Sequence, residues 1–212
     1  MEPVRYSQAN QALVDAFTCL DPADMKPAYW GDDAVTSVRK QAKDHYIFAQ
    51  NRKCCYCKRE YPTGNNAVWD GEHIIPRSKA VKFLFEPRNL AAACKDCNIA
   101  KGEDEVRVNP QRVSFPDQSQ HYLIVHPHFD EYEDHIRWYG EVVRPLTDKG
   151  IKLTQMCNLH RFGLLKVGEK VLPINSHADN IVGKFMDPHA SPLELDMALA
   201  AFTVYVKSVP QA

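Results

Sequence analysis

Two pairs of cysteines, each with two residues between its members, constrain the fold of this chain more than any other feature. Cys54 and Cys57 form the first pair, Cys94 and Cys97 form the second, and residues 58–93 separate them. Each pair presents two thiolates from one tight turn, and four thiolates are a usual ligand set of a structural zinc site. Disulfides are the alternative, but they are typical of small secreted chains, which this sequence does not resemble. We therefore predict a zinc staple.

The remaining cysteines have other expected roles. Cys55 lies inside the first pair, and it could replace Cys54 only by breaking the two-residue spacing. Cys19 and Cys157 stand alone, and a lone cysteine more often packs as a small buried hydrophobe than binds a metal. We leave all three out of the predicted zinc site.

The segment between the cysteine pairs carries groups that suit hydrolysis of a phosphodiester bond. This reaction needs an activated water, a Lewis acid and a way to hold the phosphate. His73 can act as the base because imidazole titrates near neutral pH. Glu72 and Asn98 offer hard oxygen ligands that suit Mg²⁺ or Mn²⁺. Asn89 could orient His73 through a hydrogen bond.

Two basic residues in the same stretch, Arg77 and Lys101, could contact phosphate oxygens. Taken alone, an acid beside a histidine is more often a surface pair or a satisfied core histidine than a catalytic site. The position of Glu72-His73 between the two cysteine pairs, with Asn98 directly after the last cysteine, favours the functional interpretation.

This arrangement resembles the zinc-bearing HNH endonucleases. The matching motifs, in order, are Cys54/Cys57, Glu72-His73 with Pro76, Asn89-Leu90, Cys94/Cys97, Asn98 and Lys101. The resemblance implies an α+β fold with a ββα-metal, treble-clef-like core, in which His73 ends the first strand, Asn89 lies in the connecting loop and Asn98 starts the helix.

The resemblance also implies roles for these residues. His73 would be the general base, Glu72 and Asn98 would hold one catalytic divalent ion, and the products would carry 5′-phosphate and 3′-hydroxyl ends. Two positions depart from the common pattern: a glutamate stands where many members have Asp or His, and Asn98 replaces the last His. Both substitutions keep an oxygen ligand.

Length and charge set wider bounds. A chain of 212 residues is one or two domains, and its net charge of −1 gives no overall sign of nucleic-acid binding. Residues 52–101, however, hold ten basic and five acidic side chains. A basic patch around a phosphate site is expected of a nucleic-acid enzyme, although lysines and arginines scattered over a solvated surface are the alternative. The sequence lacks a signal peptide or an apolar run long enough to span a membrane, so we expect a cytoplasmic location.

The flanks divide the chain into three predicted parts: an N-terminal helical segment (1–50), the HNH core (51–108) and a C-terminal accessory region (109–212) of mixed α/β character. Apolar spacing predicts a first helix over residues 6–20 and a second from Asp32 or Asp33 to about Asn51.

In the C-terminal region we expect a strand at 121–126, a hairpin over 136–143 that turns at Gly140, and helices at 153–165 and 191–206. Histidines and acids cluster at 127–135, where a polar turn is a better interpretation than a second metal site because no ligand spacing recurs. Arg161 could touch a substrate or partner, or cap a helix end.

The form of Glu72, His73, Pro76 and Ser78 also resembles the HNH effectors of prokaryotic anti-phage defence systems. That resemblance implies DNA as the target and an ATPase partner subunit (PtuA-like). We therefore expect a metal-dependent endonuclease with structural Zn²⁺ and catalytic Mg²⁺ or Mn²⁺. The alternatives are a zinc treble-clef module that binds nucleic acid without cutting it and a subunit that docks on a partner.

Overall fold

The computed structural model describes residues 1–63, 65–166, 181, 183–185 and 187–208. Helix α1 (Gln8–Thr18) confirms the first predicted helix, and it begins where the Ser7 side chain accepts a hydrogen bond from the Asn10 amide. Helix α2 (Thr36–Ala49) begins later than predicted because Asp32 caps a separate 3₁₀ turn, Asp33–Val35, instead of the α-helix itself.

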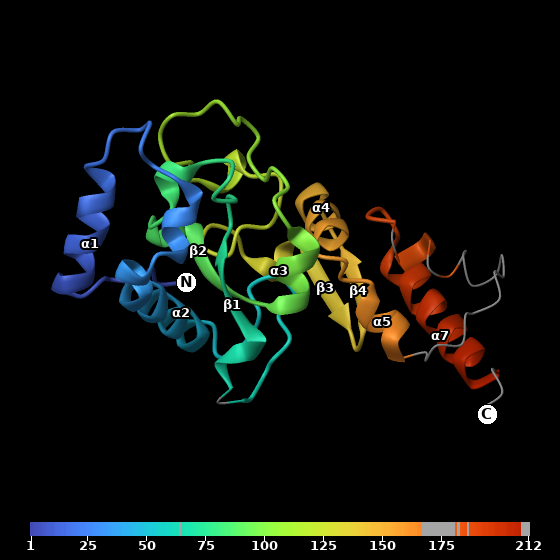
Figure 1. Cartoon of the computed structure of the whole chain (residues 1–212). Coiled ribbons are helices and arrows are strands. Elements are labelled where there is room, and N and C mark those ends of the chain that lie inside the picture. The colour runs from blue at the N-terminus through green and yellow to red at the C-terminus, as the bar shows by residue number, and fades with distance from the viewer. Residues whose placement is uncertain (64, 167–180, 182, 186, 209–212) are drawn as a thin grey trace.

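The core of the fold is a two-stranded sheet followed by a short helix. Strands β1 (Trp69–His73) and β2 (Leu90–Cys94) are antiparallel, with Trp69 opposite Cys94 and His73 opposite Leu90. Helix α3 (Lys95–Lys101) follows β2 directly. This ββα order confirms the predicted fold class, and Figure 1 shows the unit between α2 and the C-terminal elements. The helix begins at Lys95, three residues before the expected start at Asn98.

The loop between β1 and β2 contains two 3₁₀ turns, Val81–Phe83 and Pro87–Asn89. Asn89 therefore lies at the end of the connecting loop, as predicted. The loop is well buried for an irregular segment, and Leu84 and Asn89 are both fully inaccessible to solvent. A buried loop must satisfy its backbone polar groups internally, and this requirement explains the role of Asn89 described below.

Strands β3 (Ile136–Tyr139) and β4 (Val142–Pro145) form the predicted hairpin. Its turn contains Gly140 at a φ of +62°, a conformation that glycine adopts without a steric penalty. Helix α4 (Asp148–Met156) follows, capped by the Thr147 side chain on the Gly150 amide.

Two predictions in the C-terminal region are wrong. Residues 121–126 form a 3₁₀ turn end and an irregular segment instead of a strand; Ile124 and Val125 are adjacent yet both buried, which a one-sided strand does not allow. The helix predicted at 153–165 is two helices, α4 and α5 (Arg161–Lys166). The chain breaks between them at Asn158, which has a φ of +47°.

Helix α7 (Pro192–Ser208) is the last element, and it begins as predicted. The Ser191 amide donates to Glu194 Oε2 (2.9 Å) while the Glu194 amide donates to Ser191 Oγ (3.3 Å), so the two residues form a reciprocal capping box. Leu195 and Ala198 face a small cluster that includes Phe185 and Val142. Figure 1 places α7 at the opposite end of the molecule from α1.

One large hydrophobic cluster joins the three predicted parts of the chain. It extends from Val4 and Tyr46 through Trp69 and Ile74 to Leu159, so it crosses both predicted boundaries, at 50/51 and at 108/109. The cysteine pairs and β1–β2 lie within this cluster, and the candidate site is therefore built directly on the core.

Candidate metal centre and active site

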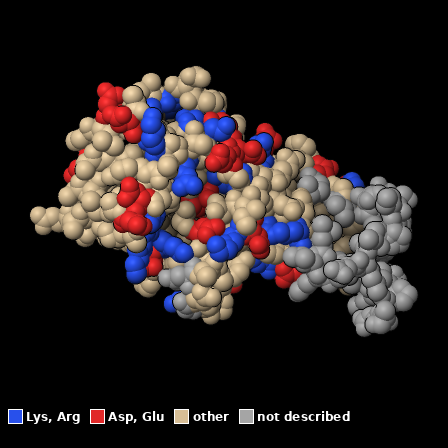
Figure 2. All heavy atoms as spheres, viewed as in Figure 1, with Lys and Arg blue, Asp and Glu red and all other residues tan. Residues whose placement is uncertain are grey.

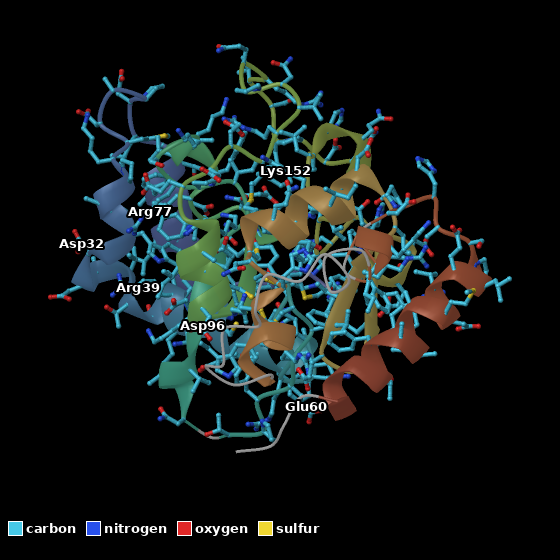
Figure 3. The ribbon with its side chains drawn as sticks, turned by 90° about the vertical axis from the view of Figure 1, so that its right-hand side faces the viewer. Asp32, Arg39, Glu60, Arg77, Asp96 and Lys152 are labelled. Carbon is cyan, nitrogen blue, oxygen red and sulfur yellow. The ribbon has the colours of Figure 1, made fainter. Side chains whose placement is uncertain are left out.

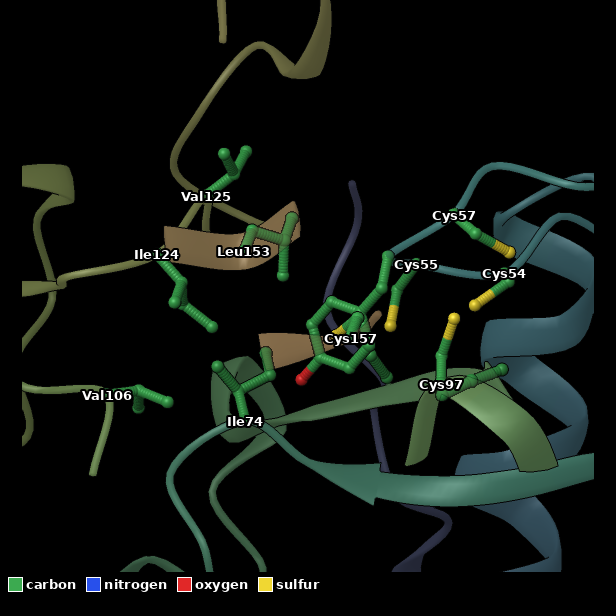
Figure 4. Close-up of a cluster of buried hydrophobic side chains, with 14 of the residues drawn as sticks. Cys54, Cys55, Cys57, Ile74, Cys97, Val106, Ile124, Val125, Leu153 and Cys157 are labelled. Atoms are coloured by element: carbon green, nitrogen blue, oxygen red, sulfur yellow. The ribbon is translucent and has the colours of Figure 1, made fainter. Parts of the chain in front are cut away.

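The four cysteines of the two pairs come together as predicted. Their Sγ atoms all lie within 4.8 Å of one another, and all four side chains are buried. Figure 4 shows the sulfurs of Cys54, Cys57 and Cys97 turned toward one another. Four soft thiolates at this separation are the donor set that a structural zinc ion requires, so the chemistry of the group fits zinc.

The other cysteines lie outside this group. Cys55 is buried, and it is not one of the four cysteines whose sulfurs converge. Cys157 is also buried, as predicted, whereas Cys19 is exposed and the prediction of burial for it is wrong. Cys19 follows the last residue of α1, where the chain turns through solvent.

Arg161 contacts the cysteine group from the C-terminal region. Its Nη2 donates to Cys97 Sγ at 3.1 Å, and its Nη1 donates to the carbonyl oxygens of Cys157 (2.5 Å) and Asn158 (2.9 Å). The guanidinium therefore satisfies carbonyls at the end of α4, one of the predicted roles, and also contacts a cysteine sulfur. The sequence carries no signal for the second contact.

Strand β1 divides its side chains between two environments, because successive residues of a strand point to opposite faces. Asp70 and Glu72 face α3: Asn98 Nδ2 donates to Asp70 Oδ2 at 2.9 Å, and Lys101 Nζ lies 2.7 Å from Glu72 Oε1. His73 contacts Trp30, with the two ring centroids 4.4 Å apart and the rings nearly perpendicular.

His73 is buried and its tautomer is fixed by a backbone group. Its Nε2 lies 3.0 Å from the carbonyl oxygen of Leu84. A carbonyl can only accept, so the hydrogen is assigned to Nε2, and Nδ1 is then the basic atom. Burial lowers the pKa of His73 to about 3; the Leu84 carbonyl opposes this shift, and the positive charges of Arg77 and Lys101 add to it. The imidazole is therefore neutral at neutral pH.

Glu72 lies in a closed polar cluster. Its carboxylate accepts from Tyr56 Oη at 2.8 Å and pairs with Lys101, and the two side chains of the ion pair are 3% and 1% exposed. Burial raises the pKa of Glu72, and the ammonium of Lys101 opposes that shift. Lys101 Nζ also donates to the carbonyl oxygen of His73 at 3.1 Å.

This geometry corrects two sequence predictions. Lys101 is not accessible to a phosphate here, because its ammonium is buried on Glu72 and on the β1 backbone. Asn89 does not hydrogen bond to His73; instead its side chain accepts from the Ile75 amide (2.8 Å) and donates to the carbonyls of Ile75 (3.2 Å) and Phe83 (3.1 Å). The Asn89 side chain therefore provides hydrogen-bond partners for backbone groups of the buried loop.

A cavity of about 480 Å³ lies between β1, α3 and the N-terminal segment. The lining includes Trp30, Asp70, Glu72, His73, Arg77 and Asn98. Arg77 is exposed, so its guanidinium is accessible to a ligand in the cavity. Figure 3 shows Arg77 apart from Lys152 and Glu60. The cavity thus combines a neutral imidazole, hard oxygen donors and one accessible cationic side chain.

The predicted basic patch does not surround this cavity. Two basic residues line it, Arg77 and the buried Lys101, together with the acids Asp70, Glu72 and Glu103. Figure 2 shows Lys and Arg side chains interspersed with Asp and Glu on the face in view. Other basic residues of the segment are engaged elsewhere; Arg59, for example, stacks on the rings of Trp138 and Phe162.

Sequence reasoning missed three residues of the site: Asp70, Tyr56 and Trp30. Asp70 had a detectable signal, because the alternation of a strand ending at His73 places it on the same face as Glu72. Tyr56 and Trp30 had none, since nothing in their spacing predicts that they reach β1.

The cluster of histidines and acids at 127–135 is a polar turn, as predicted. Asp130 accepts from the His126 amide at 2.7 Å and pairs with Lys149 at 2.9 Å, and Tyr132–Asp134 form a 3₁₀ turn. Among the residues that the structure describes, the four clustered cysteines are the single group of three or more His, Cys, Asp or Glu side chains placed to share a metal ion.

Comparison with known proteins agrees with this geometry. Residues 54–104 match the family model of the HNH endonucleases. The Septu protein PtuB of Bacillus thuringiensis is 24% identical over 115 residues, which cover 54% of this chain and 39% of that protein. The chain thus aligns with about two fifths of the length of this relative. No solved structure matches significantly.

Within the described residues, no helix is both long and apolar enough to cross a lipid bilayer. The match over residues 54–104 spans both cysteine pairs, β1, β2 and α3, and it includes every lining residue of the cavity named here except Trp30. The chain therefore contains an HNH endonuclease domain at residues 54–104.

Proposed function

We propose that this protein is a metal-dependent endonuclease that hydrolyses phosphodiester bonds in DNA. The observation that supports it best is the state of His73, a buried neutral imidazole that lines the cavity with its hydrogen on Nε2 and its lone pair on Nδ1. Burial keeps the ring unprotonated at neutral pH, as a general base must be, and a pKa of about 3 also makes it a weaker base than an imidazole that titrates near neutrality.

In the proposed reaction, His73 Nδ1 accepts a proton from a water that attacks the phosphorus in line. The Leu84 carbonyl holds the opposite edge of the ring, so it orients the base and stabilises the imidazolium that forms. Arg77 contacts a phosphate oxygen. The products carry 5′-phosphate and 3′-hydroxyl ends.

The cavity has oxygen donors that fit a divalent cation such as Mg²⁺ or Mn²⁺, namely the Asn98 amide and the carboxylates of β1. When bound, such an ion would neutralise the charge that builds on the phosphate and the leaving 3′ oxygen. Of these donors, Asn98 and Asp70 are partly exposed, while Glu72 is closed off by Lys101 and Tyr56.

The biological setting is proposed from the likeness to the Septu protein PtuB. By that likeness, the chain acts in the cytoplasm as the nuclease effector of a prokaryotic anti-phage defence system, together with a PtuA-like ATPase partner. A partner that contributes DNA contacts would also account for the modest basic surface around the cavity.

The alternative is a subunit that binds nucleic acid through the zinc module, or docks on a partner, without cutting. One observation favours it: Leu193 and Met197 lie one turn apart on α7, and these apolar side chains are 69% and 64% exposed. An exposed apolar helix face is common at protein interfaces.

Incubation of supercoiled plasmid with the purified protein tests the proposal. We expect nicking or linearisation with Mg²⁺ or Mn²⁺ and none with EDTA. A protein that retains plasmid in a gel-shift assay but leaves it uncut with every divalent cation would support the binding subunit instead. Chain-end analysis of the products by ligation would check the predicted 5′-phosphates.

A further inference from the structure

We propose that Asp70, and not Glu72, is the β1 carboxylate that holds the catalytic cation with Asn98. The inference rests on the proposed metal-dependent activity, and it changes which carboxylate of β1 binds the catalytic cation. Two acids lie on the same face of β1, and each contacts a different side chain of α3. The two contacts differ in kind, and the assignment follows from that difference.

Asp70 and Glu72 are two residues apart on β1 and face α3, while Asn98 and Lys101 are about one turn apart on α3. The result is two parallel contacts: Asn98 meets Asp70 at 2.9 Å, and Lys101 meets Glu72 at 2.7 Å. One contact is amide to carboxylate and the other is ammonium to carboxylate. The two acids therefore differ in how closely a cation already neutralises them.

Glu72 is poorly placed to take a second cation. Its Oε1 already accepts from both Lys101 and Tyr56, and its side chain is 3% exposed. A divalent ion that took the place of the Lys101 ammonium on Oε1 would leave a cation whose side chain is 1% exposed without its partner. A buried ammonium without its counter-ion is costly, because nothing then offsets its desolvation.

Asp70 is open to the cavity and has partners that can be exchanged. Its side chain is 27% exposed, and Lys95, its ionic partner at 3.2 Å, is 54% exposed. An exposed pair of this kind contributes little stability, so Lys95 can move into solvent at low cost. If the Asn98 amide turns over, its Oδ1 replaces Nδ2 beside Asp70. Two hard oxygens then face the cavity.

Two protein oxygens suffice for the expected ion. Mg²⁺ is usually held by one or two carboxylates and keeps several water molecules that substrate phosphates can replace. Glu72 then has a positioning role: together with Lys101, which donates to the His73 carbonyl at 3.1 Å, it fixes the end of β1 from which the base projects.

Manganese binding to the zinc-loaded full chain tests this inference without any cleavage. Free Mn²⁺ is measured by electron paramagnetic resonance as protein is titrated. We expect Asp70→Asn to weaken binding by at least about tenfold, a loss seen even for residues that only support a ligand. Asp96→Asn is the matched control, because Asp96 is an exposed acid of α3 outside the cavity lining.

Two further variants separate Asp70 from Glu72. The double variant Glu72→Gln/Lys101→Met removes both charges of the buried pair together, and we expect it to bind Mn²⁺ as the wild type does. Lys95→Gln changes an exposed side chain, so the fold is retained, and because the ion pair is weak we expect this variant to bind Mn²⁺ at least as tightly as the wild type.

The outcomes are distinguishable. Wild-type affinity in Asp70→Asn, or weaker binding in Lys95→Gln, would overturn the assignment to Asp70 even if the protein cuts DNA. Loss of Mn²⁺ binding in a folded Glu72→Gln/Lys101→Met variant would return the ligand role to Glu72. If the wild type binds no Mn²⁺ with or without DNA and does not cut, the proposed function itself fails.

Discussion

At the scale of single residues, the environment of His73 depends on the loop between β1 and β2. The loop leaves the strand after His73 and returns the Leu84 carbonyl to the ring of that histidine. Asn89 fixes this path, since its side chain bonds to the backbone of Ile75 and of Phe83, the residue before Leu84. Asn89 therefore acts on the base through the loop rather than by direct contact.

Replacement of Asn89 by alanine should accordingly lower both stability and activity. The change leaves the amide and the carbonyl of Ile75 without these partners in a buried loop, while the Phe83 carbonyl keeps the Glu86 amide. A buried unsatisfied polar group costs about 1–3 kcal/mol, so we expect a loss of about 3 kcal/mol or more in the free energy of unfolding. Urea denaturation measures it, with Asn109→Ala on the exposed surface as control. A loss below about 1 kcal/mol would contradict the proposal that the Asn89 side chain stabilises the buried loop.

The sequence can predict some of these residues and not others. The cysteine spacing identifies all four members of the metal cluster, because two-residue spacing directly encodes a shared turn. The prediction for Lys101 is wrong because a lysine at the end of a helix is usually exposed, and no local pattern reveals the acid that faces it from the strand. Long-range contacts of this kind lie outside the information in residue spacing.

At the scale of elements, the cysteine group joins three parts of the chain. Cys54 and Cys57 come from the turn after α2, whereas Cys94 and Cys97 come from the junction of β2 and α3. Arg161 brings the start of α5 to the same group through Cys97. Zinc at this point would therefore fix the helix that carries Asn98.

We expect Cys97→Ser to lose zinc and to unfold the core, since a hydroxyl is a much poorer zinc ligand than a thiolate and the site holds four buried thiolates. Elemental analysis and a thermal melting curve measure the two effects. Cys19→Ser, at an exposed cysteine outside the cluster, should change neither. Full zinc content and an unchanged melting curve in Cys97→Ser would disprove the staple.

The packing of α4 against the hairpin depends on Gly150. A Cβ at this position would lie 2.0 Å from the carbonyl oxygen of His135, so Gly150→Ala forces the helix away from the start of β3. Overpacking typically costs about 1–3 kcal/mol, and we expect a loss in this range by urea denaturation. Gly183→Ala is the matched control, because a Cβ added there would meet nothing within 4 Å. Equal stability of the two variants would rule out the close contact.

The elements also show where local pattern is informative. The hairpin at Gly140 and the capping box at Ser191 are predictable because a few adjacent residues determine them. The strand prediction at 121–126 fails, since the adjacent Ile124 and Val125 are both buried while Leu123 is exposed. The break at Asn158 escapes prediction because the apolar spacing continues through it.

At the scale of the whole molecule, one core encloses histidines from distant parts of the chain. Burial lowers the pKa of His73 to about 3, and it also lowers the pKa values of His126 and His128. The folded chain thus resists protonation at these sites, while the unfolded chain takes up protons near pH 6.5. The stability contributed by these sites is fully present above about pH 6.5 and declines as the pH falls below it.

His126→Phe should make this decline shallower. The His126 ring stacks on Phe129 with centroids 4.3 Å apart, and phenylalanine keeps that contact while removing one titrating group. Between about pH 6.5 and 5.5 the variant should lose up to about 1.4 kcal/mol less than the wild type in urea denaturation. Thiolate protonation affects both proteins alike and cancels in the difference. His189→Ala, at an exposed side chain, is the matched control, and parallel curves for wild type and His126→Phe would show that burial of His126 does not set this pH dependence.

In the molecule as a whole, His73 is the proposed base of a nuclease built on a zinc-stapled ββα unit. The most direct test is cleavage of supercoiled plasmid in Mg²⁺ or Mn²⁺ by His73→Ala beside the wild type, with zinc content and circular dichroism measured on both. We predict that the wild type cuts, and that the variant folds, keeps its zinc and does not cut. A folded, zinc-loaded variant that cuts at the wild-type rate would show that His73 is not the base.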